Sequence, residues 1–203
     1  RTHIENNTII ARNYTRGIWA SYADISNNTI TGIANNYWAI GHGINNVITG
    51  NTITDMLHGI LASGQSDNVI DGNNIQVSNT GINGDGAQNL SVTNNTFEIG
   101  SGRFISADNA QGEHTYSNNV INISSGDWLI YVTNADNVAI ENNIQNNAVG
   151  NGIYINNVPA VITGNLLTTS GRGMEITNQA GTEVTNNTII SSGGDYGVYI
   201  ADF

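Results

Sequence analysis

The sequence contains no cysteine, so disulfide bonds, thiolate metal sites and cysteine nucleophiles are excluded. It also contains no lysine and only five arginines against 16 acidic residues, which gives a formal net charge of −11. Nucleic acid binding needs clustered cations, so we expect no nucleic-acid partner. The same charge disfavours anionic membranes and anionic glycans. No apolar run approaches the ~20 residues of a membrane-spanning helix, so we expect no membrane insertion.

Proline is nearly absent too, with Pro159 the single one, and charged residues make up only 10% of the chain. Glycine, with 24 residues, and asparagine take their place. Both residue types favour tight turns over long helices. Hydrophobic residues make up 38% and recur at regular positions, which indicates a packed core rather than disorder.

One short pattern recurs nine times at spacings of 21 to 24 residues. Each copy has Asn or Gly followed by an invariant Asn. The two residue types at the first position accept a positive φ most readily, so a sharp bend is expected once per repeat. The nine invariant residues, which we call the anchor asparagines, are Asn7, Asn28, Asn51, Asn73, Asn95, Asn119, Asn143, Asn165 and Asn187.

Apolar residues flank each anchor, three residues before it and two residues after it, as Ile25 and Ile30 flank Asn28. The seventh repeat departs, because Ile144 comes one residue early. A third segment of the form Gly-apolar-x-apolar occurs at residues 59–62, 152–155, 173–176 and 197–200, with weaker copies that begin at Gly17 and Gly81. Each repeat therefore predicts three short strands that point branched side chains into one interior.

Three strands in about 22 residues make one coil, and equivalent strands of successive coils would pair in parallel, ~4.8 Å apart. The sequence therefore predicts an all-β fold, a parallel β-helix of about nine coils that forms a single domain over residues 1–203. Right-handedness follows from the crossover rule for parallel strands. The anchor asparagines would stack into a ladder of side-chain hydrogen bonds.

The repeat resembles those of the pectin-lyase-like superfamily of right-handed parallel β-helices, in phrases such as Asn46-Val47-Ile48-Thr49-Gly50-Asn51-Thr52-Ile53. The resemblance covers essentially the whole chain and implies the fold. It leaves the function open, since the superfamily includes polysaccharide lyases, glycoside hydrolases, adhesins and surface proteins.

Four residues are candidates for catalysis. Gly41-His42-Gly43 is similar to a segment of polygalacturonases, although that family's Asp-Asp and lysine-containing segments are missing, and a turn histidine is the alternative interpretation. Asp85, Arg103 and Glu175 could share one face of the rod, and scattered surface charge is the alternative there. No sequence motif indicates a metal or another cofactor, although calcium remains compatible with the acidic composition.

Several aromatic residues are expected on the outside of the third strand or near it. An outward aromatic stripe can stack against sugar rings or contact another protein, and scattered surface aromatics are the alternative. The candidates for glycan or partner contact are Trp19, Trp38, Trp128, Tyr131, Tyr154 and Tyr199.

The sequence therefore favours a secreted or cell-surface β-solenoid with a structural, adhesive or self-assembling role. Contact with a glycan fits this role, and a polysaccharide lyase or glycoside hydrolase is the alternative. No cap is evident at either end, so the chain is either a segment of a longer solenoid or a subunit that associates end to end.

Overall fold

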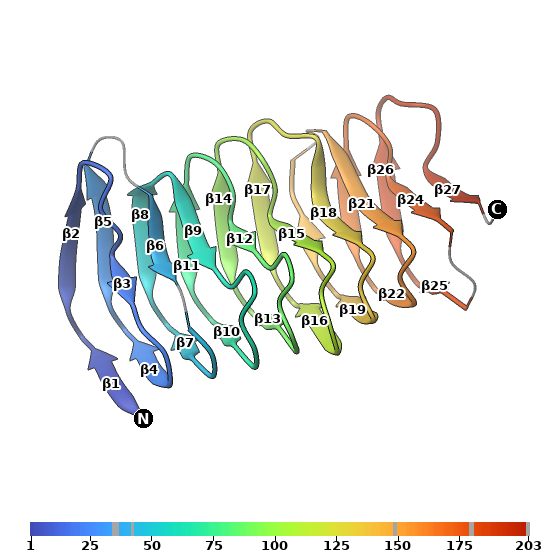
Figure 1. The fold of residues 1–203 in the computed structure, drawn as a ribbon. Helices are drawn as coiled ribbons and strands as arrows, with labels where there is room; N and C mark the ends of the chain where they lie inside the picture. Colours follow the sequence, from blue (N-terminus) through green and yellow to red (C-terminus); the bar gives the residue numbers. More distant parts are fainter. Residues whose placement is uncertain (34–36, 42, 148–149, 179–180, 202–203) are drawn as a thin grey trace.

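The structure is a computed structural model that describes residues 1–33, 37–41, 43–147, 150–178 and 181–201. These residues form three parallel sheets of nine strands each, wound as successive coils along a rod (Figure 1). The predicted all-β parallel β-helix of about nine coils is confirmed. Across these ranges there is no helix long and apolar enough to cross a membrane.

Each coil contributes one strand to each sheet, in the order A, B, C. Sheet A consists of β1 (Thr2–Glu5), β4 (Ala23–Ser26), β7 (Val47–Thr49), β10 (Val69–Asp71), β13 (Ser91–Thr93), β16 (Glu113–Ser117), β19 (Asn137–Glu141), β22 (Ala160–Thr163) and β25 (Glu183–Thr185). Sheet B consists of β2 (Thr8–Arg12), β5 (Thr29–Ile33), β8 (Thr52–Met56), β11 (Asn74–Val77), β14 (Thr96–Ile99), β17 (Val120–Ile123), β20 (Ile144–Gln145), β23 (Leu166–Thr169) and β26 (Thr188–Ser191). Sheet C consists of β3 (Ile18–Trp19), β6 (Trp38–Gly41), β9 (His58–Leu61), β12 (Ile82–Asn83), β15 (Ile105–Asp108), β18 (Trp128–Thr133), β21 (Asn151–Asn156), β24 (Met174–Thr177) and β27 (Val198–Ala201).

The bend between sheets A and B has the predicted left-handed conformation in all nine coils. The residue before each anchor has a φ between 53° at Asn142 and 68° at Gly164. A residue with positive φ bends the chain sharply, so in every coil the sheet A strand ends two residues before the anchor and the sheet B strand begins directly after it.

The anchor asparagines form the predicted ladder, in which each coil is bonded to the next. The backbone N–H and the side-chain Nδ2–H of Asn95 both donate to Oδ1 of Asn119, each at 3.0 Å. Nδ2 of Asn95 also donates to the carbonyl of Ile70 in the preceding coil at 3.0 Å. Asn119 repeats this pattern toward Asn143 and Val92. The buried amides are thus hydrogen-bonded from both sides, which makes their burial tolerable.

A second, shorter ladder lies at the bend from sheet C back to sheet A, and the sequence reasoning missed it. The backbone N–H of Asn46 donates to Oδ1 of Asn68 at 2.9 Å, and Asn46 in turn accepts from the backbone N–H of Ala23 at 3.0 Å. The preceding residues Asn45 and Asp67 again have positive φ. The signal in the sequence is one further Asn-Asn pair, Asn45-Asn46, and the related pair Asp67-Asn68.

The apolar residues that flank the anchors stack into columns that fill the interior. The structure departs from the predicted pattern at two kinds of position. In the seventh coil the pairing continues without a shift, and Gln145 stands between Ile121 and Leu167 in the buried column. Ile144 consequently points outward and is exposed. In two coils without a Gly-apolar-x-apolar segment, buried Phe104 and Leu129 occupy the position of its glycine.

The ladder generates a prediction for stability. Asn119→Ala removes the Oδ1 that accepts from the backbone N–H of Asn95 and the Nδ2–H that donates to the carbonyl of Val92, and each unsatisfied buried group costs about 1–3 kcal/mol. We expect the free energy of unfolding to fall by about 3 kcal/mol in urea titrations followed by circular dichroism. The matched control is Asn137→Ala, which removes an exposed side chain bonded to Glu113 at 3.2 Å. Equal losses in the two variants would contradict a stabilising ladder.

Burial of His114 generates a second prediction. The ring is 2% exposed, and desolvation lowers its pKa below the usual 6.5 although Nε2 lies 2.9 Å from the carbonyl of Gln111. The unfolded chain therefore binds more protons than the folded one just below pH 6.5, and the free energy of unfolding falls as pH drops through that range. His114→Leu removes this contribution to the pH dependence of stability. We therefore expect the unfolding midpoint of the variant to change less between pH 7 and pH 5 than that of the unmodified protein. Parallel pH profiles would show that His114 does not contribute.

Candidate functional site: the outer face of sheet C

The outer face of sheet C carries the sequence-predicted contact residues, because its strands repeat the same inward and outward positions in every coil. The buried position is held by Ile60, Ile130 and Ile153 in their coils, and the residue after it points outward. Trp19, Tyr131, Tyr154, Glu175 and Tyr199 share that outward position. This face also includes Arg103, which precedes β15, and Asp85, which follows β12.

Arg103, Tyr131 and Tyr154 form a stack along the rod axis. The Arg103 guanidinium lies 4.0 Å from the Tyr131 ring centre, and Tyr131 and Tyr154 stack with ring centres 5.0 Å apart at 12°. Trp128 lies beside Tyr154 with ring centres 5.2 Å apart. Side chains of neighbouring coils meet in this way because the coils are in register.

A polar hollow of about 340 Å³ adjoins Arg103 at one end of this stack. Arg103 also approaches Asp127, at 3.9 Å from guanidinium to carboxylate, with Asp127 mostly exposed. The hollow therefore presents guanidinium, amide, hydroxyl and carboxylate groups together. Its lining residues are Asn79, Thr80, Asn83, Gly102, Arg103, Ser106 and Asp127.

Two of the aromatic residues named as candidates for glycan or partner contact are buried in the structure. Trp38 and Trp128 are each 8% exposed. Trp38 stacks on His58 with ring centres 4.5 Å apart, and desolvation lowers the pKa of His58. Trp128 is covered in the same way, because its ring leans on Tyr154 of the next coil. The faces of Tyr131 are likewise covered by Arg103 and Tyr154, so it presents its edge and hydroxyl outward.

Trp19 differs from the other indoles, because it is 43% exposed. A Cβ atom at Gly41 would lie 2.7 Å from a carbon of the Trp19 ring, so the ring rests closely on this glycine of the next coil. The absence of a side chain at Gly41 is what lets the indole lie against the sheet.

Among the described residues, Asp85, Arg103 and Glu175 each bond to other partners rather than to one another. Asp85 accepts hydrogen bonds from Ser106 and from the backbone N–H of Asp108, both at 3.0 Å. Glu175 pairs with Arg172, 2.5 Å away, three coils beyond Arg103. His42 lies outside the described residues.

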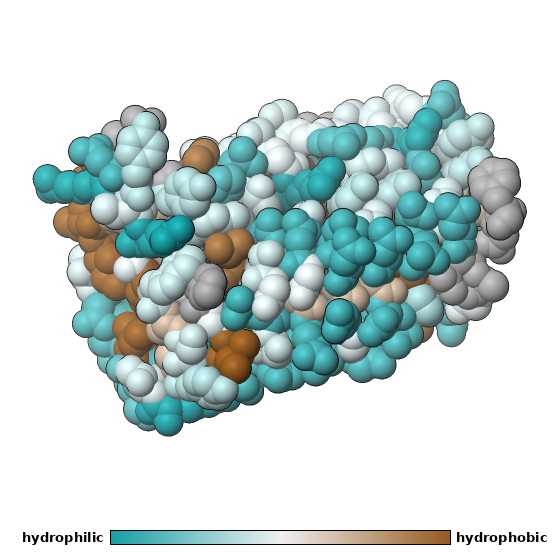
Figure 2. All heavy atoms as spheres, in the orientation of Figure 1, coloured by the Kyte–Doolittle hydropathy of each residue, from teal (hydrophilic) through white to brown (hydrophobic). Residues whose placement is uncertain are grey.

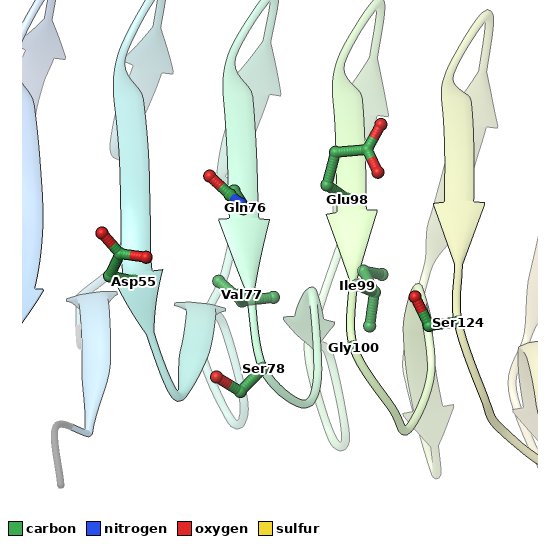
Figure 3. Close-up of a pocket in the computed structure, with 8 residues that line it drawn as sticks. All are labelled: Asp55, Gln76, Val77, Ser78, Glu98, Ile99, Gly100 and Ser124. Carbon is green, nitrogen blue, oxygen red and sulfur yellow. The ribbon is translucent and has the colours of Figure 1, made fainter. Parts of the chain in front are cut away.

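A second hollow, of about 310 Å³, lies over sheet B (Figure 3). Asp55, Gln76 and Glu98 reach it from three successive strands, β8, β11 and β14. Asp55 has a φ of 56° and stands where the pairing of β8 with β11 shifts register. This hollow contains carboxylates and no arginine, unlike the hollow of sheet C. Within the described ranges, no group of three or more His, Asp or Glu side chains is placed to hold a metal ion.

These features define the chain as a parallel β-helix protein with one continuous outer face of mixed polar and aromatic character. Comparison with protein families agrees, since the model of the right-handed β-helix region matches residues 14–128 and 128–202. The chain belongs to this family, which establishes its right-handedness. Searches of curated proteins and of solved structures returned no match.

The burial of the three tryptophans predicts their response to a polar quencher. Iodide should quench Trp19 strongly and Trp38 and Trp128 weakly, because iodide reaches only solvent-exposed indoles. Trp19→Phe should therefore abolish most of the quenchable fluorescence, whereas Trp38→Phe and Trp128→Phe retain it. A quenchable fraction that persists in Trp19→Phe would contradict the arrangement of this face.

Proposed function

We propose that the protein is a secreted or cell-surface rod that binds a glycan chain along the outer face of sheet C. The observation that carries the proposal is the polar hollow beside the Arg103–Tyr131–Tyr154 stack. The proposed role is adhesion through this face rather than catalysis.

The chemistry of the hollow suits a polyhydroxylated ligand. A sugar ring offers hydroxyl groups that both donate and accept, and the hollow supplies amides at Asn79 and Asn83, a hydroxyl at Ser106 and a charged pair at Arg103 and Asp127. Hydrogen bonds to charged groups contribute more than neutral ones, about 1.5–3 kcal/mol each. Tyr131 and Tyr154 add hydroxyls and apolar edges next to the hollow.

The shape of the face suits an extended ligand. Successive outward side chains repeat at every coil, ~4.8 Å apart, so a chain that follows the rod axis meets equivalent positions repeatedly. Figure 2 shows this side of the molecule as mostly hydrophilic, with hydrophobic residues gathered toward the N-terminal end. A polysaccharide is a repeating ligand that can use such a surface over several coils.

The proposal predicts binding that depends on Arg103. We expect the 203-residue chain to bind at least one member of an array of neutral and acidic oligosaccharides, with affinity then measured by isothermal titration calorimetry. Arg103→Gln should weaken that affinity by about tenfold or more, since 1.4 kcal/mol corresponds to a factor of ten.

The matched control is Arg12→Gln, which removes another exposed arginine at the end of β2 in sheet B. It should leave the affinity within about twofold. An array without any bound glycan, or equal losses in the two variants, would overturn the proposed function.

A further inference from the structure

Arg16, at the N-terminal end of the sheet C face, is held between two aromatic rings. Its guanidinium carbon lies 4.1 Å from the Trp19 ring centre and 5.6 Å from that of Tyr37. Tyr37 is 44% exposed and Trp19 43% exposed, so this group stands at the surface. Contacts of a cation with aromatic rings are attractive and orient the planar guanidinium.

Arg16 differs from the other arginines of this face in having no carboxylate partner within the described ranges. Arg103 approaches Asp127 at 3.9 Å, and Arg172 pairs with Glu175 at 2.5 Å and Asp195 at 3.5 Å. Aromatic faces leave the N–H donors at the edge of the guanidinium available, and these donors match the two oxygens of a carboxylate or sulfate. Among the described residues Arg1, Arg103 and Arg172 pair with carboxylates, whereas Arg16 and Arg12 do not, and of these two only Arg16 is flanked by aromatic rings.

Residues of the next coils support the two aromatic rings that flank Arg16. Trp19 rests on Gly41, where a Cβ atom would lie 2.7 Å from its ring. Tyr37 meets His58 edge to face with ring centres 6.3 Å apart, and His58 is stacked on the buried Trp38. Both rings that flank Arg16 are therefore supported from the next coils.

We propose that Arg16, Trp19 and Tyr37 form a subsite for a sugar that carries one anionic substituent, a carboxylate or a sulfate. The substituent pairs with Arg16, and the sugar ring packs against the parts of the Trp19 and Tyr37 rings that stay exposed beside the guanidinium. Asp85, Asp108 and Glu175 farther along the same face repel a polyanion. The ligand is therefore a largely neutral glycan with an isolated acidic sugar. This inference rests on the proposed function for the identity of the ligand as a glycan.

The test observes Arg16 directly. The Nε–H resonance of Arg16 is assigned in the ¹⁵N-labelled 203-residue chain and followed by NMR during titration with glucuronate, glucose 6-sulfate, glucose and acetate. We expect saturable shifts with one or both acidic sugars and none with glucose. Acetate should bind about tenfold more weakly, because it lacks a ring to pack on Trp19. The acidic sugar that saturates the shift at the lower concentration, glucuronate or glucose 6-sulfate, shows whether the subsite prefers a carboxylate or a sulfate.

Two variants separate the subsite from non-specific attraction. Arg16→Gln should abolish the response of Tyr37 and Trp19 resonances to acidic sugars, whereas Arg12→Gln should preserve it. Gly41→Ala should displace Trp19 and weaken acidic sugars by about tenfold while acetate is unaffected. Its far-UV circular dichroism spectrum checks that the coils remain folded.

The inference is overturned if Arg16 shifts no more than Arg12, or if glucose shifts Arg16 as strongly as the acidic sugars do. It is also overturned if polygalacturonate binds more tightly per site than glucuronate. A bound glycan on the array together with an unresponsive Arg16 would leave the proposed function standing and remove only the subsite. If no glycan on the array is bound but Arg16 responds to the acidic sugars, the subsite stands and the proposed function is removed.

Discussion

The hydrogen bond from each anchor asparagine to the next is the interaction on which the rest of the structure depends. An amide buried in an apolar interior costs free energy unless its donors and acceptors are paired. Here the pairing partner is the same residue one coil later, together with a carbonyl one coil earlier, as at Asn95. The ladder therefore sets both the distance between coils and their register. A coil shifted by one residue would lose the hydrogen bonds to both neighbouring coils.

The register also determines which side chains are neighbours on the candidate binding face. Because coils repeat without slipping, side chains about 22 residues apart in sequence become neighbours, and Arg103 reaches Tyr131 although they are far apart in the chain. Even the seventh coil, with Gln145 in the apolar column, keeps the pairing of β20 with both neighbours. The outer face can vary in chemistry from coil to coil because the inner columns and the ladder carry the fold.

The sequence predicted the structural features that recur from coil to coil, but not the side-chain contacts that occur at a single place in the rod. The nine bends, the ladder and the apolar columns were predictable because each recurs in all or nearly all of the coils. Burial of Trp38 and Trp128 was not, since it depends on which side chain the next coil places beside each indole. The support of Trp19 by Gly41 was equally hidden, because a glycine in a strand predicts only weakened packing until its neighbour is known. The polar hollow combines residues of three coils, whose adjacency becomes visible only with the pairing of β12, β15 and β18.

The most direct measurement of the central claim is hydrogen exchange at the asparagine side-chain amides by NMR. The seven internal anchors, from Asn28 to Asn165, should exchange orders of magnitude more slowly than exposed Asn137, because their Nδ2–H groups donate within the rod. Asn7, at the end of the ladder, should exchange faster than these seven. Internal anchors that exchange as fast as Asn137 would contradict a structure held together by this ladder.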